Sequence, residues 1–324
     1  MQLARFLRVP NHFHWGILGL ATALVATPVA AGPTLLYEAR SGEVLYEEDA
    51  GQLWYPASLV KMMTAYMTFE AVREGRLAWN GTLELSEYAR SQPATRMGLR
   101  QGLSVTIEET VKALIMRSAN DFAVALAENI AGSEADFVIE MNATARRLGM
   151  LNTRFTNPHG LPDPEQVTTA YDLALLTSAI LRDFPERAEI FSTAHAPIAK
   201  GAIHSSNDLL RTVAGADGMK TGFTCGSGYN IVASASRDGR QIIAVVLGEF
   251  TRQARSLRAA ALLEYGFKVA GWKHLIGAPK LGERHAAAAE TAPVLDMTKL
   301  TRTRKCGNSS RDPFAEASLP KRKK

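Results

Sequence analysis

The spacing of apolar residues changes three times along this chain, and these changes restrict the possible fold most strongly. Residues 34–49, TLLYEARSGEVLYEED, alternate as a β-hairpin does, with a turn at Ser41-Gly42. Between about residues 55 and 185 the apolar residues recur with helical spacing, and from Gly218 the strand pattern returns. Strands at both ends with helices between them predict one α+β domain, with an antiparallel sheet from the terminal strands and a helical lobe from the middle.

The expected helices fill the middle of the chain. The first begins near Pro56 and stops at Gly75, because glycine commonly follows the end of a helix. Another begins at Thr106, where Glu109 completes a capping box. Further helical patterns cover residues 121–132, 133–150 and 168–185. Residues 155–166, FTNPHGLPDPEQ, are rich in turn formers and are predicted to be a loop.

The expected strands of the second half are residues 217–224, 229–236 and 240–249. Asp238-Gly239 is a tight-turn signal between the last two strands. A helical pattern over residues 254–272 follows and closes the domain. We therefore expect residues 32–272 to form one domain and residues 273–324 a low-complexity, disordered tail.

The N-terminus has the pattern of an export signal. Arg5 and Arg8 precede an apolar stretch, residues 16–27, and Val29 with Ala31 offers a small-residue cleavage site. Residues 1–31 are therefore predicted to be a signal peptide, and the alternative is an uncleaved membrane anchor. Either interpretation predicts an exported protein of the periplasm or cell envelope, with association to the inner membrane as a further possibility.

The positive charge of the chain is concentrated at its C-terminus. The formal net charge is +5, while residues 300–324 alone carry eight Lys or Arg and two acids. The body is therefore close to neutral, which argues against a nucleic-acid partner. The terminal KRKK is an ordinary solvated charge run, or it makes weak contact with anionic lipid or cell-wall polymer.

A serine and a lysine near the start of the first helix form the first candidate site. Ser58 and Lys61 are three residues apart in YPASLVKMMT, so in a helix they share one face. A serine hydroxyl needs an adjacent base to become a nucleophile. Lys61 qualifies only if burial and a second nearby cation lower its pKa far below the usual ~10.4. Taken alone, the pair also fits a helix cap and a surface charge.

A second candidate is the triplet Ser118-Ala119-Asn120, at a break between two expected helices. Polar residues at such a break commonly cap the next helix. In the functional interpretation Ser118 relays a proton between Lys61 and a leaving group, and Asn120 holds a substrate amide carbonyl.

The third candidate, Lys220-Thr221-Gly222, begins a predicted strand. It is either an ordinary strand start with an exposed lysine, or a site in which Lys220 places positive charge beside an anionic substrate. Gly222 would let another backbone approach closely, and the strand edge could pair with an extended peptide. The backbone N–H groups of Phe223 and Ser58 are then candidates for an oxyanion hole.

The three pieces occur in the order known for penicillin-binding proteins and class A β-lactamases. Over about residues 33–272 the sequence resembles the low-molecular-mass penicillin-binding proteins, the serine D-alanyl-D-alanine carboxypeptidases. The likeness extends to SANDFAVALAE, NPHGLPDP, SSNDLL and DGMKTGFT. It implies a β-lactamase/penicillin-binding transpeptidase-like fold that needs no cofactor. No Cys/His cluster has zinc spacing, so we expect no metal.

The resemblance implies serine chemistry on peptidoglycan stem peptides, with β-lactam antibiotics as acylating inhibitors. Ser58 would attack the penultimate D-Ala carbonyl and release the terminal D-Ala, with Lys61 as base and Ser118 as relay. The other substrate-binding positions would be Asn120, Lys220, Thr221, Gly222 and Phe223. Arg255 matches an arginine that serves the substrate's terminal carboxylate, and Arg252 is a competitor because a variable turn precedes it.

Other functions remain as alternatives. A D,D-endopeptidase would cut cross-linked peptidoglycan with the same residues. A β-lactamase needs a glutamate to activate water, yet residues 152–160 hold no carboxylate and Glu165 lies in a later loop. A non-catalytic wall-binding protein would not need these motifs intact. His159 and His204 are expected to be structural.

The chain has two cysteines, Cys225 and Cys306. A fixed disulfide between them is possible but not favoured, because Cys306 lies in a polar tail.

Overall fold

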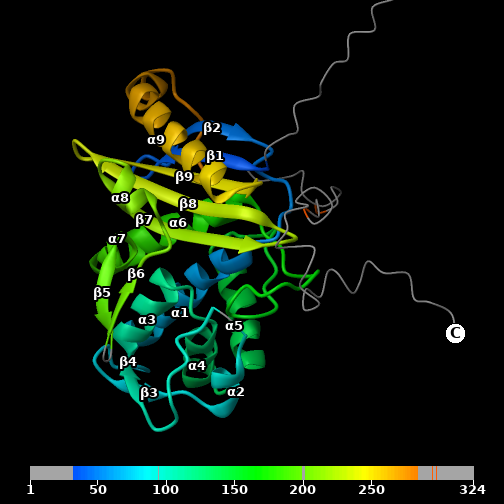
Figure 1. The fold of residues 1–324 in the computed structure, drawn as a ribbon. Coiled ribbons are helices and arrows are strands. Elements are labelled where there is room, and N and C mark those ends of the chain that lie inside the picture. Colours follow the sequence, from blue (N-terminus) through cyan, green and yellow to red (C-terminus); the bar gives the residue numbers. More distant parts are fainter. Residues whose placement is uncertain (1–31, 94, 199–200, 284–293, 295–296, 298–324) are drawn as a thin grey trace, which may run out of the picture. The chain divides into compact units, whose positions relative to one another are not determined.

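A five-stranded antiparallel sheet built from both ends of the chain organises the fold (Figure 1). The computed structural model describes residues 32–93, 95–198, 201–283, 294 and 297, all within the unit Ala31–Lys324. The predicted signal peptide, residues 1–31, lies outside the described residues, as does most of the predicted tail. The sheet has the strand order β2-β1-β9-β8-β7. The α+β prediction is therefore confirmed.

The larger elements follow the sequence pattern closely. The strands of the sheet are β1 (Thr34–Glu38), β2 (Val44–Glu48), β7 (Ala216–Thr224), β8 (Gly228–Arg237) and β9 (Arg240–Glu249). The larger helices are α1 (Lys61–Arg73), α3 (Ile107–Met116), α4 (Asn120–Ala131), α5 (Glu134–Arg147), α6 (Ala170–Asp183) and α9 (Arg252–Leu275). The capping box of Thr106 and Glu109 is present at the start of α3, as predicted. Asp238 and Gly239 both have positive φ and form the turn between β8 and β9.

Both faces of the sheet are covered, which explains why its central strands are almost continuously apolar. In β9, Ile242 and Val246 pack in the cluster that includes residues of α9. The alternate residues Ile243 and Val245 pack in the cluster of the helical lobe. Because successive strand side chains point to opposite faces, a strand buried on both sides keeps apolar residues at successive positions. The orange α9 lies over one face in Figure 1, and α1 and α6 lie on the other.

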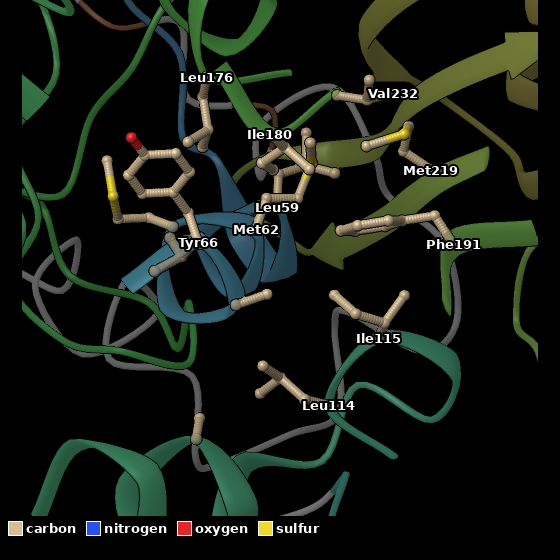
Figure 2. Close-up of a cluster of buried hydrophobic side chains, with 14 of the residues drawn as sticks. Leu59, Met62, Tyr66, Leu114, Ile115, Leu176, Ile180, Phe191, Met219 and Val232 are labelled. Carbon is tan, nitrogen blue, oxygen red and sulfur yellow. The ribbon is translucent and has the colours of Figure 1, made fainter. Parts of the chain in front are cut away.

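Helix α1 runs through the centre of the protein and is buried on all sides. Each residue from Lys61 to Ala71 is buried, including its polar ones. Figure 2 shows Met62 and Tyr66 of α1 beside Leu176 and Ile180 of α6, with side chains of α3 and the sheet nearby. This burial positions the start of α1 rigidly, and it surrounds Lys61 with a low-dielectric interior.

The strand β7 forms one edge of the sheet and pairs only with β8 among the described strands. Its residues Lys220, Thr221 and Gly222 pair with Val232, Ile231 and Asn230 of β8. At Gly222, β7 also lies against the segment that precedes α1. A Cβ on Gly222 would lie 3.1 Å from the nitrogen of Ser58 in that segment. This arrangement brings the first and third sequence motifs together.

Several small elements have no counterpart in the sequence prediction. They are β3 (Thr82–Glu84), α2 (Glu87–Ser91), β4 (Ser104–Thr106), 3-10 helix η2 (Pro185–Arg187), α7 (Glu189–Ser192), β5 (His195–Ile198), β6 (Gly201–His204) and α8 (Leu209–Thr212). Strands β3 and β4 pair with each other, as do β5 and β6. These pairs form two small sheets outside the main one.

The chain beyond residue 272 makes specific contacts with the domain. Helix α9 continues to Leu275, and the N–H of Leu281 donates to the carbonyl of Gly42 at the β1–β2 turn. Met297 is buried, and its N–H donates to the carbonyl of Gly226 at the β7–β8 turn. Among the residues that the structure describes, no helix is both long and apolar enough to span a bilayer.

Cys225, in the same β7–β8 turn, is disulfide-bonded. The sequence left a bridge at Cys225 possible but did not favour it, because Cys306 lies in a polar stretch. Met297, from the same part of the chain, contacts Gly226, the residue next to Cys225. Cys306 lies outside the described residues.

Candidate active site

Ser58 lies in a short 3-10 helix, η1 (Ala57–Val60), that continues directly into α1. The preceding residue, Ala57, has φ 49°, a left-handed conformation that alanine adopts at a cost. Neither η1 nor α1 has a side-chain cap. Ser58 is therefore not a helix cap, which was the alternative to a functional role in the sequence analysis. Its side chain is half-buried and borders a cleft.

Lys61 lies one helical turn after Ser58 and is completely buried. Its Nζ donates to Ser58 Oγ at 3.4 Å and to Asn120 Oδ1 at 2.8 Å. It also donates to the backbone carbonyl of His159. Burial, and secondly the positive charge of Lys220, lower the pKa of Lys61 well below its ordinary value. Proximity to Ser58 and a lowered pKa are two properties that a base for Ser58 requires.

Two glycines let other backbone segments approach Ser58. A Cβ on Gly222 would lie 3.1 Å from both the nitrogen of Ser58 and the oxygen of Pro56. A Cβ on Gly160 would lie 2.0 Å from the oxygen of Ala57 and 2.9 Å from the nitrogen of Ser58. The close approach predicted for Gly222 is thus present, and Gly160 adds a second one from the loop of residues 155–166.

We expect Gly160→Ala to impair acylation of Ser58 strongly. Gly160 has φ +82°, and the added methyl would displace the backbone of Ala57 and Ser58. A displacement of about 1 Å at a reacting group costs about 100-fold in rate, and the strain costs about 1–3 kcal/mol of stability. The measurement is the rate of labelling by a fluorescent penicillin, together with thermal unfolding.

Gly75→Ala is the matched control for that variant. Gly75 also has positive φ, at +73°, but among the described residues, its own chain neighbours aside, no atom lies within 4 Å of the position that its added methyl would take. It should lose only the stability that left-handed alanine costs, about 1 kcal/mol, and keep its labelling rate. Labelling of Gly160→Ala at the wild-type rate would contradict this account of Gly160.

Asn120 contacts Lys61 from the first residue of α4, and Ser118 lies two residues earlier in the lining of a cleft. Ser118 has φ 60°, and its buried Oγ has no hydrogen-bond partner among the described residues. Asn120 accepts from Lys61 and donates through Nδ2 to the carbonyl of Pro93 at 3.0 Å. The residue before α4 is Ala119, without a side-chain cap, so neither polar residue serves as the helix cap. Ser118 is available as a proton carrier, whereas Asn120 holds Lys61 in place.

Lys220 is buried, which excludes the exposed strand-start lysine of the alternative interpretation. Its Nζ donates to the carbonyl of Thr221 at 2.8 Å. Burial, and then the charge of Arg255, lower the pKa of Lys220 to about 7. The hydroxyl of Thr221 lies 2.9 Å from that of Ser206. Lys220 is therefore a cation whose charge is sensitive to pH near neutrality.

A cleft of about 380 Å³ joins these motifs. Its lining includes Ser58, Thr95, Met116, Arg117, Ser118, Ser206, Thr221, Gly222, Phe223, Tyr229, Arg252 and Arg255. Phe223, 39% exposed, stacks on Tyr229 with ring centroids 4.2 Å apart. Both candidate carboxylate ligands, Arg252 and Arg255, border the cleft, and Arg255 is the buried one. The described lining contains no carboxylate.

Of the two histidines considered from the sequence, His159 is buried and His204 is exposed. Burial, and then the charge of Lys61, lower the pKa of His159 to about 3, so its ring is neutral. Its Nδ1 accepts from the N–H of Leu161 at 3.2 Å. His204 lies exposed on β6, with its ring centroid 6.1 Å from that of His195. No group of three potential metal ligands occurs in the described part of the chain.

Sequence reasoning missed three contributors to the site. The backbone carbonyl of His159 holds Lys61, and Ser206 contacts Thr221. Asp208 binds Arg255, with 2.8 Å between Oδ1 and Nη2. The carbonyl carries no side-chain signal. Ser206 and Asp208 lie in SSNDLL, which contributed to the family resemblance. The resemblance assigned no role to the individual residues of this stretch.

Comparison with known proteins identifies relatives of this chain. The family model described as D-alanyl-D-alanine carboxypeptidase matches residues 21–251. D-alanyl-D-alanine carboxypeptidase DacA of Haemophilus influenzae is 37% identical over 245 residues, which cover 74% of this chain and 62% of that protein. The match thus spans less than two thirds of the length of this relative.

Solved structures give the same result. Penicillin-binding protein 5 from Haemophilus influenzae superposes with a TM-score of 0.71 at 36% identity, covering 76% of this chain and 73% of that one. Penicillin-binding protein D2 from Listeria monocytogenes, in its ampicillin-bound form, has a TM-score of 0.67 at 34% identity, covering 73% and 97%. The fold is therefore the transpeptidase-like fold of penicillin-binding proteins, and the chain belongs to the D-alanyl-D-alanine carboxypeptidase family.

Proposed function

We propose that this chain is a serine D-alanyl-D-alanine carboxypeptidase that removes the terminal D-Ala from peptidoglycan stem pentapeptides. The observation that carries the proposal is the buried Lys61, with its lowered pKa, within hydrogen-bond reach of Ser58 at a cleft that Arg255 also borders. The family match and the identity to DacA of Haemophilus influenzae support the same activity.

In the proposed acylation step, Ser58 Oγ attacks the carbonyl carbon of the penultimate D-Ala. The proton of Ser58 passes to the Nζ of Lys61, and the oxyanion is held by the backbone N–H groups of Ser58 and Phe223. Because the backbones of Gly222 and Ser58 adjoin, these two groups come from neighbouring segments. Lys220 and Arg255 attract the terminal carboxylate, Thr221 borders the peptide, and Asn120 holds Lys61 in place.

The acyl-enzyme forms when the bond to the terminal D-Ala breaks. Ser118, whose hydroxyl has no partner among the described residues, passes the proton from Lys61 to the departing amine. Water then attacks the ester carbonyl, releases the shortened peptide and returns the proton to Ser58. The roles of base and acid alternate on Lys61 across the two halves of the reaction.

We propose that β-lactams acylate the same serine. The Listeria relative is described in an ampicillin-bound form, which supports this extension. A fast β-lactamase is disfavoured because the described lining of the cleft has no carboxylate to activate water. Glu165, the nearest alternative in sequence, is exposed and paired with Arg154 at 2.9 Å.

Cleavage of cross-linked peptidoglycan by the same residues is the second candidate function, because Ser58, Lys61 and Lys220 would serve either substrate. The deciding experiment incubates the chain with a stem pentapeptide and with cross-linked muropeptides. Release of D-Ala from the pentapeptide alone supports the carboxypeptidase. Cleavage of the cross-link as the faster reaction supports the endopeptidase, and no reaction with either contradicts both.

We further propose that the protein acts in the periplasm or cell envelope, where its substrate occurs. The signal-like residues 1–31 support export, and the basic C-terminal residues are suited to weak contact with membrane or wall.

The kcat/KM for an N-acetylated pentapeptide should decline as the pH rises above about 7. Lys220 is charged below its lowered pKa of about 7 and neutral above it, so its attraction for the terminal carboxylate is lost with rising pH. Lys61 must be neutral to act as base, and burial lowers its pKa well below the ordinary value, so it becomes neutral at a lower pH than an ordinary lysine. Constant kcat/KM between pH 6 and pH 9 would show that Lys220 has a different role.

A further inference from the structure

The segment Ser206–Asn207 is fixed to two walls of the cleft. The N–H of Ser206 donates to the carbonyl of Met116 at 2.9 Å, and its hydroxyl lies 2.9 Å from the Thr221 hydroxyl. Asn207 is buried and donates through Nδ2 to the carbonyl of Gly218 at 2.9 Å. The end of α3 and the strand β7 therefore hold this segment, and the next residue, Asp208, starts from a rigid support.

Asp208 reaches from this support to helix α9. Its Oδ1 accepts from Arg255 Nη2 at 2.8 Å. The hydroxyl of Ser256 lies 3.0 and 2.9 Å from the two carboxylate oxygens, which fixes the orientation of the carboxylate. The Arg255 side chain is 4% exposed and that of Asp208 is 32% exposed. The carboxylate of Asp208, together with the Ser256 hydroxyl at 3.1 Å from Arg255 Nη2, thus holds a nearly buried guanidinium that borders the cleft.

The guanidinium of Arg255 retains unused donor capacity. Its Nε is buried and has no hydrogen-bond partner among the described residues. Buried donors normally find a partner, so an unsatisfied one beside a substrate cleft indicates a place for a ligand acceptor. A guanidinium has five N–H donors in a fixed plane, and one side can bind Asp208 while another binds a substrate carboxylate.

We propose that Asp208 is a positioning residue: it orients Arg255 for the terminal carboxylate of the substrate and so favours substrates with a free C-terminus. This inference rests on the proposed function and adds the residue that sets its specificity. Asp208 has two opposed effects, because its negative charge weakens the attraction for an anion while its hydrogen bond orients the cation that binds it. The proposal is that orientation dominates.

The test compares Asp208→Ala with Asp208→Asn. Both remove the same negative charge, but only asparagine keeps an oxygen that can accept from Arg255. For an N-acetylated pentapeptide with a free carboxylate, Asp208→Ala should raise KM about tenfold with kcat changed less than about threefold, because a charge-assisted hydrogen bond has this magnitude. Asp208→Asn should lie between Asp208→Ala and the wild type. The same peptide with a C-terminal amide should show less than a twofold change in either variant.

The possible results distinguish a failure of the role of Asp208 from a failure of the proposed carboxypeptidase function. If KM for the peptide with a free carboxylate stays at the wild-type value or falls in both variants, the positioning role is overturned. The negative charge of Asp208 would then be its main effect on binding. Equal losses on the acid and the amide would also overturn it, because they indicate a general structural defect. A wild-type chain that cleaves neither peptide would contradict the proposed function itself, whereas an active wild type with unaffected variants contradicts only the role of Asp208.

Discussion

The Ser58→Ala variant is expected to form no covalent adduct with a labelled penicillin and to release no D-Ala from a pentapeptide. The variant lacks the hydroxyl oxygen that Lys61 contacts at 3.4 Å at the edge of the cleft. Loss of the nucleophile of a serine hydrolase lowers kcat by on the order of 10³-fold or more. In intact-protein mass spectrometry, the wild type should gain the mass of one penicillin and the variant none.

The same variant should remain folded. Ser58 is half-buried, and Lys61 keeps its partners Asn120 and His159 when the hydroxyl is removed. A change of this kind alters the free energy of unfolding by about 1 kcal/mol or less. Ser91→Ala, at an exposed serine of α2, is the control and should label as the wild type does. An adduct on Ser58→Ala, mapped to another residue, would remove Ser58 from its proposed role.

The main elements of the fold could be predicted because each has a strong local signal. Strands β8 and β9 are apolar at successive positions, and Asp238-Gly239 between them adopts the positive φ values that its residue types tolerate. Helix α3 begins at the capping box predicted from Thr106 and Glu109. The hairpin of β5 and β6 could not be predicted in the same way. Its strands are four residues each, and alanine, glycine and proline in them give no strand pattern.

The site was predictable only in part, for a related reason. Ser58 and Lys61 are three residues apart, so helical geometry alone brings them together. The contact of Lys61 with the carbonyl of His159 joins positions 98 residues apart, and every residue carries a carbonyl. The pairing of Asp208 with Arg255 spans 47 residues and depends on how α9 packs on the sheet. Such contacts follow from the tertiary fold, which no local pattern encodes.

Lys61→Met should acylate penicillin about 10²–10⁴ times more slowly than the wild type, because this is the usual contribution of a general base. Methionine has a similar length to lysine and is suited to a buried position, so a large cavity does not form. The variant leaves Asn120 Oδ1 and the His159 carbonyl without their donor, which costs stability. Removing a buried amine offsets part of this cost, since burial is the main cause of the lowered pKa of Lys61.

Lys112→Met is the matched control for this prediction. Lys112 lies on α3, where it pairs with Glu108 at 2.6 Å and does not border the cleft. Its replacement makes the same Lys→Met change away from the cleft and should leave the acylation rate unchanged, which separates loss of the base at Lys61 from a general effect of the substitution. The measurement is the second-order rate constant for acylation, with near-ultraviolet circular dichroism to check the native packing.

If Lys61→Met acylates within about threefold of the wild type while Ser58→Ala does not acylate at all, another group must take the proton of Ser58. Ser118 would then be the first residue to substitute, because its buried hydroxyl has no partner among the described residues.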